Sequence, residues 1–253
     1  MSGLRKITPI SLADDAHASI RDAIVSGTFA PGEKLVETRI AREIGVGRAT
    51  AREALRRLRE EGLVVGTPNR GVFVRELALQ DIIDIYNMRT GVETVAMRLA
   101  TRTGAPTGEL WKCVEEMREF ARRNDPVSLS DREVAFHEEI CRASGNEYIC
   151  AGFRTIAGVV RLAFACEYTS YADPRLVPEE HAQLVEAIES GDEHASVEAL
   201  TAHLDIGRSI ELARLQFEAP PDHAGERLVS QLGVASWQPT ATSDVAERSP
   251  SPG

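Results

Sequence analysis

The sequence lacks the features of secreted, disulfide-bonded and membrane-spanning proteins. Its 253 residues contain only four cysteines, and no two of them form a Cys-x-x-Cys pair. Scattered cysteines are more typical of small core residues in a reducing compartment than of disulfides or zinc ligands. No apolar run approaches the roughly 18 residues of a membrane span, and the N-terminal residues lack the apolar stretch of a signal peptide. We therefore expect a cytoplasmic protein that does not contact a membrane.

Charge is unevenly distributed along the chain. The whole sequence has a formal net charge of −10, which by itself argues against a nucleic-acid partner. Residues 1–75, however, hold 13 Lys and Arg against 9 Asp and Glu, a net charge of +4. Residues 76–253 hold 16 against 30, a net charge of −14. This asymmetry indicates one part that contacts phosphate and another that does not.

Residues 1–75 show the pattern of a winged helix-turn-helix. The spacing of apolar residues predicts helices over residues 12–26, 37–44 and 48–61, and Gly45-Val46-Gly47 separates the last two. Residues 63–65 and 72–74 then read as strands on either side of a turn, which predicts a β-hairpin. Two helices joined by a glycine-containing turn and followed by a hairpin are the plan of a winged DNA-binding domain.

Every strong pattern from residue 76 to residue 218 is helical. Apolar residues recur every three or four positions, and the breaks between them predict helices at about 82–99, 110–120, 131–143, 148–171, 179–190 and 193–217. We therefore expect a mainly α protein, with a winged domain at 1–75 and an antiparallel helical bundle at 76–218. Residues 219–253 are rich in Pro, Ser and Thr and lack periodicity, so we expect a disordered tail there.

The third predicted helix and the hairpin carry the candidate DNA contacts. Arg48 and Arg52 are four residues apart and share the face opposite the apolar residues of their helix. The planar guanidinium can donate two parallel hydrogen bonds to guanine or to a phosphate, and Thr50 between them could reach a base edge. Arg70 and Gly71, at the hairpin tip, are placed to contact phosphate or the minor groove. An arginine-rich helix can also be a solvated face, but the turn, the hairpin and the charge asymmetry favour DNA binding.

Four residues of the helical part could form a metal site. Glu133 and His137 are four residues apart and project from one helix face, whereas His181 and His203 lie on the last two predicted helices. Three imidazoles and a carboxylate form a plausible donor set for Zn²⁺, Ni²⁺, Mn²⁺ or Fe²⁺ if the helices pack around a common core. Spacing alone leaves open the commoner alternative, in which these histidines are exposed or satisfied within the core.

The first part of the chain resembles the GntR family of bacterial regulators. The resemblance runs from residue 20 to residue 74 and rests on Ser26-Gly27, Pro31-Gly32, Gly45-Val46, Arg48, Arg52-Glu53-Ala54-Leu55, Glu61-Gly62-Leu63 and Asn69-Arg70-Gly71. It implies that Arg48, Arg52 and the wing tip contact operator DNA. Thr38 stands where a third operator arginine is usual, with Arg39 next to it. Arg39 could substitute, although one residue turns a helical side chain by about 100°. Gly47 replaces the usual serine before the recognition helix, and glycine is a weaker helix cap.

The second part resembles the helical ligand-binding FCD domain of the FadR branch of that family. The matching segments are Arg89-x-x-x-Glu93, Phe136-His137, Ser144-Gly145-Asn146, His181 to Asp192 and Ala199 to His203. Metal-binding members use an acidic residue four before the Phe-His histidine, together with two later histidines. The resemblance therefore implies a site for a divalent metal, Zn²⁺ first among them, at Glu133, His137, His181 and His203. Glu133 replaces the usual aspartate.

An open coordination position at this metal would admit a small organic acid as effector. We expect Arg89 to be its second anchor, because a guanidinium pairs well with a carboxylate; a structural ion pair with Glu93 is the competing interpretation. A closed tetrahedral site would instead make the metal structural. The expected protein is a homodimeric, ligand-responsive regulator, more typically a repressor than an activator, that binds an inverted repeat in double-stranded DNA.

Two alternatives to a ligand-responsive regulator remain. The first is a helical metalloenzyme, for which the sequence offers no separate general base or nucleophile. The second is an architectural DNA-binding protein without an effector.

Overall fold

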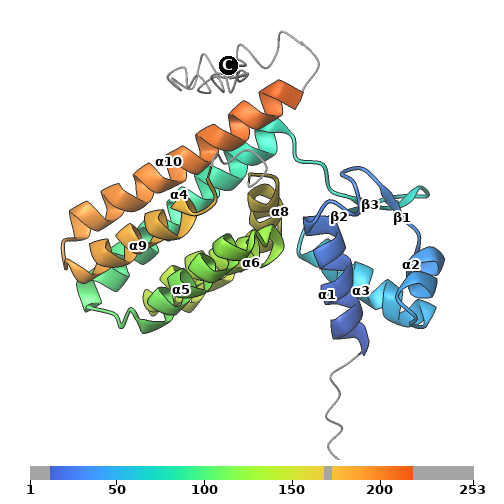
Figure 1. Ribbon diagram of the computed structural model, residues 1–253, viewed down its shortest axis with the longest axis horizontal. Helices are drawn as coiled ribbons and strands as arrows, with labels where there is room; N and C mark the ends of the chain where they lie inside the picture. Colours follow the sequence, from blue (N-terminus) through green and yellow to red (C-terminus); the bar gives the residue numbers. More distant parts are fainter. Residues whose placement is uncertain (1–11, 168–172, 219–253) are drawn as a thin grey trace, which may run out of the picture. The chain divides into compact units, whose positions relative to one another are not determined.

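The secondary structure is mainly helical. The computed structural model describes residues 12–167 and 173–218, and within these ranges it contains ten α-helices and a three-stranded sheet (Figure 1). The predicted fold class, a winged helix-turn-helix followed by an all-helical part, is confirmed. The predicted disorder of residues 219–253 concerns a segment outside the described residues.

The N-terminal part combines three helices with a small sheet. Its helices are α1 (Leu12–Val25), α2 (Glu37–Glu43) and α3 (Arg48–Glu60), and its strands are β1 (Lys34–Leu35), β2 (Val64–Thr67) and β3 (Gly71–Val74). Strand β3 lies between the other two and is antiparallel to both, with Val74 opposite Val64 and Phe73 opposite Lys34. The sequence predicts the β2–β3 hairpin but not β1, because two residues are too few to show alternation.

The core of this part forms between the inner faces of its helices and the sheet. Ala51 and Leu58 of α3 are completely buried, and Leu55 is nearly so, as their helical spacing predicts. They belong to one cluster with apolar residues from α1, α2, the strands and the connections, among them Ile20, Ile24, Leu35, Ile40, Leu63 and Val74. This packing leaves the arginine-bearing face of α3 in solvent.

The wing turn projects Arg70 from the tip of the hairpin. The backbone N–H of Arg70 donates to the carbonyl of Thr67 at 3.1 Å, which closes a four-residue turn with Pro68 in its second position. Asn69, in the third position, has a φ of +60°, in the left-handed region that asparagine tolerates better than most residues. The Arg70 side chain is therefore exposed at the tip.

The helical part contains seven helices. They are α4 (Leu79–Thr103), α5 (Gly108–Arg123), α6 (Pro126–Ala143), α7 (Glu147–Arg154), α8 (Ala157–Glu167), α9 (Leu176–Glu189) and α10 (Glu193–Glu218). Helix α4 packs along α10, α5 packs along α6, and α9 contacts both α5 and α10 (Figure 1). Buried apolar residues from all seven helices form one core, so α4, α6, α9 and α10 can each point a polar side chain into the same interior.

One predicted helix is wrong. Up to residue 167, the single helix expected over residues 148–171 is two helices, α7 and α8, with an angle of 51° between Glu147–Arg154 and Ala157–Ala165. The last four residues of that expected helix lie outside the described part of the chain. Thr155 and Ile156 donate backbone hydrogen bonds to carbonyls only three residues earlier, and the Thr155 hydroxyl also donates to the carbonyl of Gly152 at 2.7 Å. This tighter turn ends the helix, but apolar spacing continues across it and hides the break.

None of the described helices alone is long and apolar enough to cross a membrane, although the bent pair of α7 and α8 is so when taken together.

Helix α6 starts five residues earlier than the predicted start at residue 131. Pro126 occupies its first position, where the missing N–H of proline has no helical partner to lose. The carboxylate of Asp125 accepts a hydrogen bond from the backbone N–H of Ser128 at 3.0 Å and so caps the helix. The Asn124-Asp125-Pro126 segment between α5 and α6 is therefore a helix start.

Candidate DNA interface and metal centre

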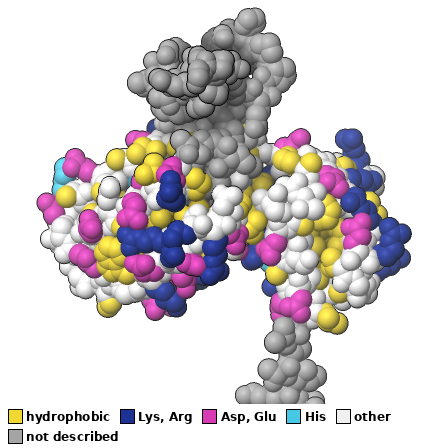
Figure 2. All heavy atoms as spheres, viewed as in Figure 1, with side chains coloured by type: hydrophobic (Ala, Val, Ile, Leu, Met, Phe, Trp, Pro, Cys, Tyr) yellow, Lys and Arg dark blue, Asp and Glu magenta, His cyan; other side chains and the backbone are white. Residues whose placement is uncertain are grey.

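The exposed face of α3 presents the predicted DNA contacts. Arg48 is the first residue of the helix and Arg52 follows one turn later; both are exposed, and Thr50 between them is half-buried. Figure 2 shows Lys and Arg side chains gathered at the outer edge of the winged part. The N-terminal half of α3 therefore carries two arginines on the side that could face a DNA groove.

A carboxylate of α2 holds one of these arginines in place. Glu37 accepts hydrogen bonds from Nε and Nη2 of Arg52, the latter at 3.0 Å. The hydrogen bond from Arg52 lowers the pKa of Glu37, with a smaller contribution from the charge of Arg48. Glu37 was not among the residues predicted for this interface. If Arg52 contacts DNA as predicted, Glu37 would compete with the DNA for its guanidinium.

The other predicted contacts are also exposed, in different surroundings. Arg39 donates to Glu43 at 2.9 Å and to Glu33 at 3.1 Å, so two carboxylates already engage it. Thr38 next to it is exposed. On the wing, Gly71 follows Arg70 and has a φ of +115°, a backbone conformation that favours glycine. The structure thus presents Arg39, Arg70 and Gly71 on the surface, where each could reach a phosphate.

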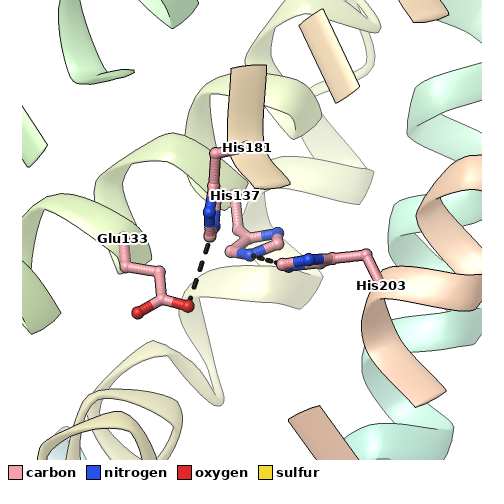
Figure 3. A group of neighbouring side chains, drawn as sticks. All are labelled: Glu133, His137, His181 and His203. Atoms are coloured by element: carbon pink, nitrogen blue, oxygen red, sulfur yellow. Dashed lines mark hydrogen bonds and ion pairs between the residues drawn. The ribbon is translucent and has the colours of Figure 1, made fainter. Parts of the chain in front are cut away.

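The four predicted metal ligands lie together in the helical part. Glu133 and His137 come from α6, His181 from α9 and His203 from α10 (Figure 3). One ligand atom from each residue lies within 4.8 Å of the others. His137 and His181 are completely buried, Glu133 is nearly so, and His203 is half-buried. Spacing along the chain relates only the first two residues, so the packing of α9 and α10 against α6 completes the group.

Two of the separations between donor atoms are close to those around a transition metal. The Nε2 atoms of His137 and His203 are 3.4 Å apart, and Nε2 of His181 is 3.7 Å from Oε1 of Glu133. Ligands at about 2.0–2.1 Å from a tetrahedral Zn²⁺ stand about 3.3 Å apart, close to these distances. The three rings also contact one another, with the His137 and His203 rings stacked at a centroid distance of 5.3 Å.

The protonation state of the three histidines also favours metal binding. Burial lowers the pKa of His181 to about 4, and it lowers those of His137 and His203 well below the ordinary range of histidine. The imidazoles are therefore neutral at pH 7, the form that coordinates metals. A carbonyl oxygen can only accept, so Nδ1 of His181 donates to the Val177 carbonyl at 2.8 Å and its Nε2 keeps a lone pair. That Nε2 has no hydrogen-bond partner among the described residues, as expected of a metal ligand.

Arg89 lies buried close to these ligands. Its Nε donates to Oε1 of Glu93 at 2.7 Å, so the ion pair considered as the competing interpretation exists. Its Nη2, however, is buried without a hydrogen-bond partner in the described part of the chain. The guanidinium also lies over the rings of Tyr86 and Phe164, at 5.1 and 5.0 Å. Its positive charge helps to lower the pKa of His137, which places Arg89 within electrostatic reach of the centre.

Comparison with known proteins supports both parts of this description. The model of "bacterial regulatory proteins, gntR family" matches residues 12–74, and the FCD domain model matches residues 84–206. An HTH-type transcriptional regulator from the TAR-I ttuE-ttuC' intergenic region of Agrobacterium vitis is 32% identical over 130 residues, which span 49% of this chain and 76% of that protein. The gluconate operon transcriptional repressor of Bacillus subtilis is 29% identical and aligns over 74% of this chain and 79% of its own.

A solved structure shows the same architecture. The crystal structure of a GntR transcriptional regulator from Rhodococcus sp. RHA1 matches with a TM-score of 0.68 at 25% identity, covering 79% of this chain and 97% of that one. These relatives are transcriptional regulators, which argues against the metalloenzyme alternative. The chain therefore belongs to the gntR family of bacterial regulatory proteins, as a DNA-binding transcriptional regulator that carries an FCD domain.

Proposed function

We propose that this regulator is a repressor that binds a small carboxylate effector at a metal held by Glu133, His137, His181 and His203. The observation that carries the proposal is the group of neutral imidazoles beside a buried arginine with an unpartnered N–H. Zn²⁺ suits the donor set best, and Ni²⁺, Mn²⁺ and Fe²⁺ are the alternatives. The bound metal would supply positive charge and coordination positions that a carboxylate oxygen can occupy.

Arg89 is proposed as the second anchor of the effector. Its bond to Glu93 uses Nε, so Nη2 can donate to an incoming carboxylate without breaking that ion pair. A buried unpaired donor is costly, and a ligand that satisfies it recovers that free energy. The same side chain would therefore form the ion pair with Glu93 and also anchor the effector carboxylate.

We propose that the protein acts on DNA as a homodimer. Two winged domains would bind an inverted repeat, with Arg48, Thr50 and Arg52 in the major groove and Arg39, Arg70 and Gly71 at the backbone or minor groove. Exposed apolar side chains on α4 and α7 are a candidate surface for binding a second copy of the chain. Met88 is 39% exposed, Val95 is 44% exposed and Tyr148 is 92% exposed. These two helices pack against each other, so the three residues belong to neighbouring elements.

Metal analysis followed by thermal unfolding tests the effector proposal. The purified protein should contain about one metal per chain. One member of a panel of small organic acids should then raise the melting temperature of the metal-loaded protein by mass action. The shift should vanish on chelation, in His181→Ala and in Arg89→Met, and it should persist in Arg102→Ala. Arg102 lies on the same helix but pairs at the surface with Glu193. A metal-loaded protein that no acid stabilises would support the architectural DNA-binding alternative.

A further inference from the structure

A fully buried glutamate of α4 lies directly behind one of the candidate metal ligands. Both oxygens of Glu93 are engaged: Oε1 accepts from Nε of Arg89 at 2.7 Å, and Oε2 lies 2.6 Å from Nδ1 of His137. All three side chains are completely or almost completely buried. Neither the proposed set of metal ligands nor the DNA interface gives Glu93 a role.

The contact of Glu93 with His137 determines which ring nitrogen can coordinate a metal. A neutral imidazole carries one proton, and a carboxylate next to Nδ1 favours the tautomer with that proton on Nδ1. Nε2 then keeps its lone pair, and Nε2 is the atom that lies 3.4 Å from Nε2 of His203. His181 uses the same arrangement with a different acceptor, the carbonyl of Val177. Two of the three histidines are therefore oriented through Nδ1.

Arg89 partly offsets the cost of burying a carboxylate at this position. Burial raises the pKa of Glu93, and the neighbouring guanidinium opposes that rise. Such a pair seldom adds net stability compared with apolar residues of the same size, because both charges lose their hydration. Its orientation of His137 gives the pair a role that an apolar pair could not fill.

We propose that Glu93 is a positioning residue of the metal centre, which holds the His137 ring with Nε2 toward the other ligands while Arg89 fixes the carboxylate. This inference rests on the proposed metal site. Carboxylates that orient a metal-bound histidine are a general device, and their removal weakens metal binding by about 10- to 100-fold. Glu93→Gln keeps the size of the side chain but removes its charge, and its amide can also donate to Nδ1 and so permit the wrong tautomer.

Zinc affinity of the full-length protein, measured by competition with a chromophoric chelator, tests the proposal. We expect Glu93→Gln to raise the Kd for Zn²⁺ by about 10- to 100-fold. Glu211→Gln is the matched control, because Glu211 is equally buried on α10, eight residues after His203. Its Kd should remain that of the wild type, whereas His181→Ala should lose the site.

Nitrogen-15 NMR of the metal-free wild type gives a second measurement, the tautomer of the His137 ring. A loss of stability alone would not change this tautomer. His137 should carry its proton on Nδ1, and this tautomer should lose population in Glu93→Gln. Wild-type zinc affinity in Glu93→Gln, or a wild-type His137 protonated on Nε2, would overturn the inference. If Glu93→Gln does not fold, the wild-type tautomer decides alone. Failure of the proposed metal site would look different, because His181→Ala would then bind zinc as the wild type does.

Discussion

Single residues of the candidate metal centre are costly for the protein to keep without a bound metal. Three imidazoles lie in a core where protonation is unfavourable, and Nε2 of His181 is buried without a hydrogen-bond partner among the described residues. A group whose pKa is lower in the folded than in the unfolded chain stabilises the fold above its unfolded pKa. That stability is lost as the pH falls toward the folded value.

We therefore predict that the metal-free protein loses stability on mild acidification. The unfolded chain takes up a proton on His181 near its ordinary pKa of 6.5, whereas the folded chain does so only at about 4. Between pH 7.5 and pH 5 this residue alone should remove about 2 kcal/mol from the free energy of unfolding. His137 and His203 act in the same direction. Urea unfolding at several pH values, with a chelator present, measures the loss.

The matched control for this prediction is His181→Gln, which cannot titrate and should show a shallower pH dependence. Equal pH dependence in the variant and the wild type would contradict the assignment to this residue.

Among the secondary-structure elements, α3 depends on α2 for the placement of one of its predicted DNA contacts, Arg52. Glu37 of α2 holds Arg52, and both Arg48 and Arg52 lie in the N-terminal half of α3. Loss of one specific arginine contact typically costs about 1–3 kcal/mol, or roughly 5- to 150-fold in affinity. We predict losses in this range for Arg48→Ala and Arg52→Ala on a palindromic duplex selected from a random library, measured by fluorescence anisotropy.

Arg52→Ala should be the weaker binder of the two variants, because it also leaves the charge of Glu37 unpaired near the phosphates. Adding Glu37→Gln to Arg52→Ala should then recover part of the loss. Arg59→Ala, at the exposed far end of the same helix, is the control and should bind nearly as the wild type does. Wild-type affinity in both single variants would show that α3 does not read the DNA in this orientation.

Helical periodicity predicts most of these elements, and it fails where local hydrogen bonds rather than apolar spacing decide the structure. The ends of α3 are predicted within a residue, because an apolar face and a glycine mark them. The break at Thr155 and the cap at Asp125 depend on side-chain bonds to the backbone, which leave no periodic signal. Strand β1 is too short to show a pattern and exists because β3 offers it a partner.

The candidate metal centre is predictable from the sequence only in part. The spacing of Glu133 and His137 places them on one face of α6, but His181 and His203 join them only through helix packing. Residue types suggest all four as a set on condition that the helices pack together, and resemblance to a family, rather than spacing, favours that set over histidines satisfied elsewhere. The ion pair of Arg89 and Glu93 follows from their spacing on α4. The contact of Glu93 with His137 joins residues 44 positions apart, so no local sequence pattern predicts it.

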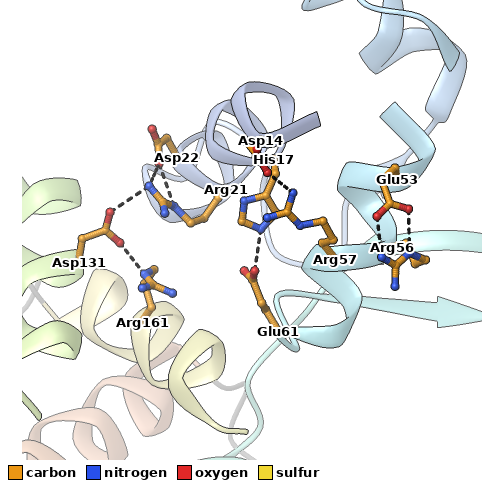
Figure 4. Close-up of polar contacts among 10 residues, drawn as sticks. All are labelled: Asp14, His17, Arg21, Asp22, Glu53, Arg56, Arg57, Glu61, Asp131 and Arg161. Atoms are coloured by element: carbon orange, nitrogen blue, oxygen red, sulfur yellow. Dashed lines mark hydrogen bonds and ion pairs between the residues drawn. The ribbon is translucent and has the colours of Figure 1, made fainter. Parts of the chain in front are cut away.

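Across residues 12–218, the winged part and the helical part make contacts through which ligand binding in the helical part could affect the winged part. Arg21 of α1 lies 3.1 Å from Asp131 of α6, and Asp131 also accepts a hydrogen bond from Arg161 of α8 (Figure 4). Leu162 of α8 is buried within the apolar cluster of the winged part. A Cβ added to Gly158 would lie 2.0 Å from the carbonyl oxygen of Glu61, so the approach there is too close for a larger residue.

Asp131 lies on the helix that carries two candidate metal ligands and also contacts the winged part. It lies two residues before Glu133 on α6, so a shift of this helix on effector binding would move Asp131 relative to Arg21. We predict that Asp131→Asn keeps metal and effector affinity but reduces the effect of the effector on DNA binding. The ratio of DNA Kd values with and without effector, roughly 5 to 150 in typical allosteric proteins, should shrink several-fold.

Anisotropy titrations of one duplex, with and without a saturating effector, measure this ratio. Glu139→Gln is the matched control, because Glu139 also lies on α6 but pairs with Arg142 of the same helix, and its ratio should stay at the wild-type value. A loss of effector affinity in Asp131→Asn would instead indicate damage to the binding site. An unchanged ratio would mean that coupling does not pass through Asp131, and the close packing of α8 against the end of α3 would become the next connection to test.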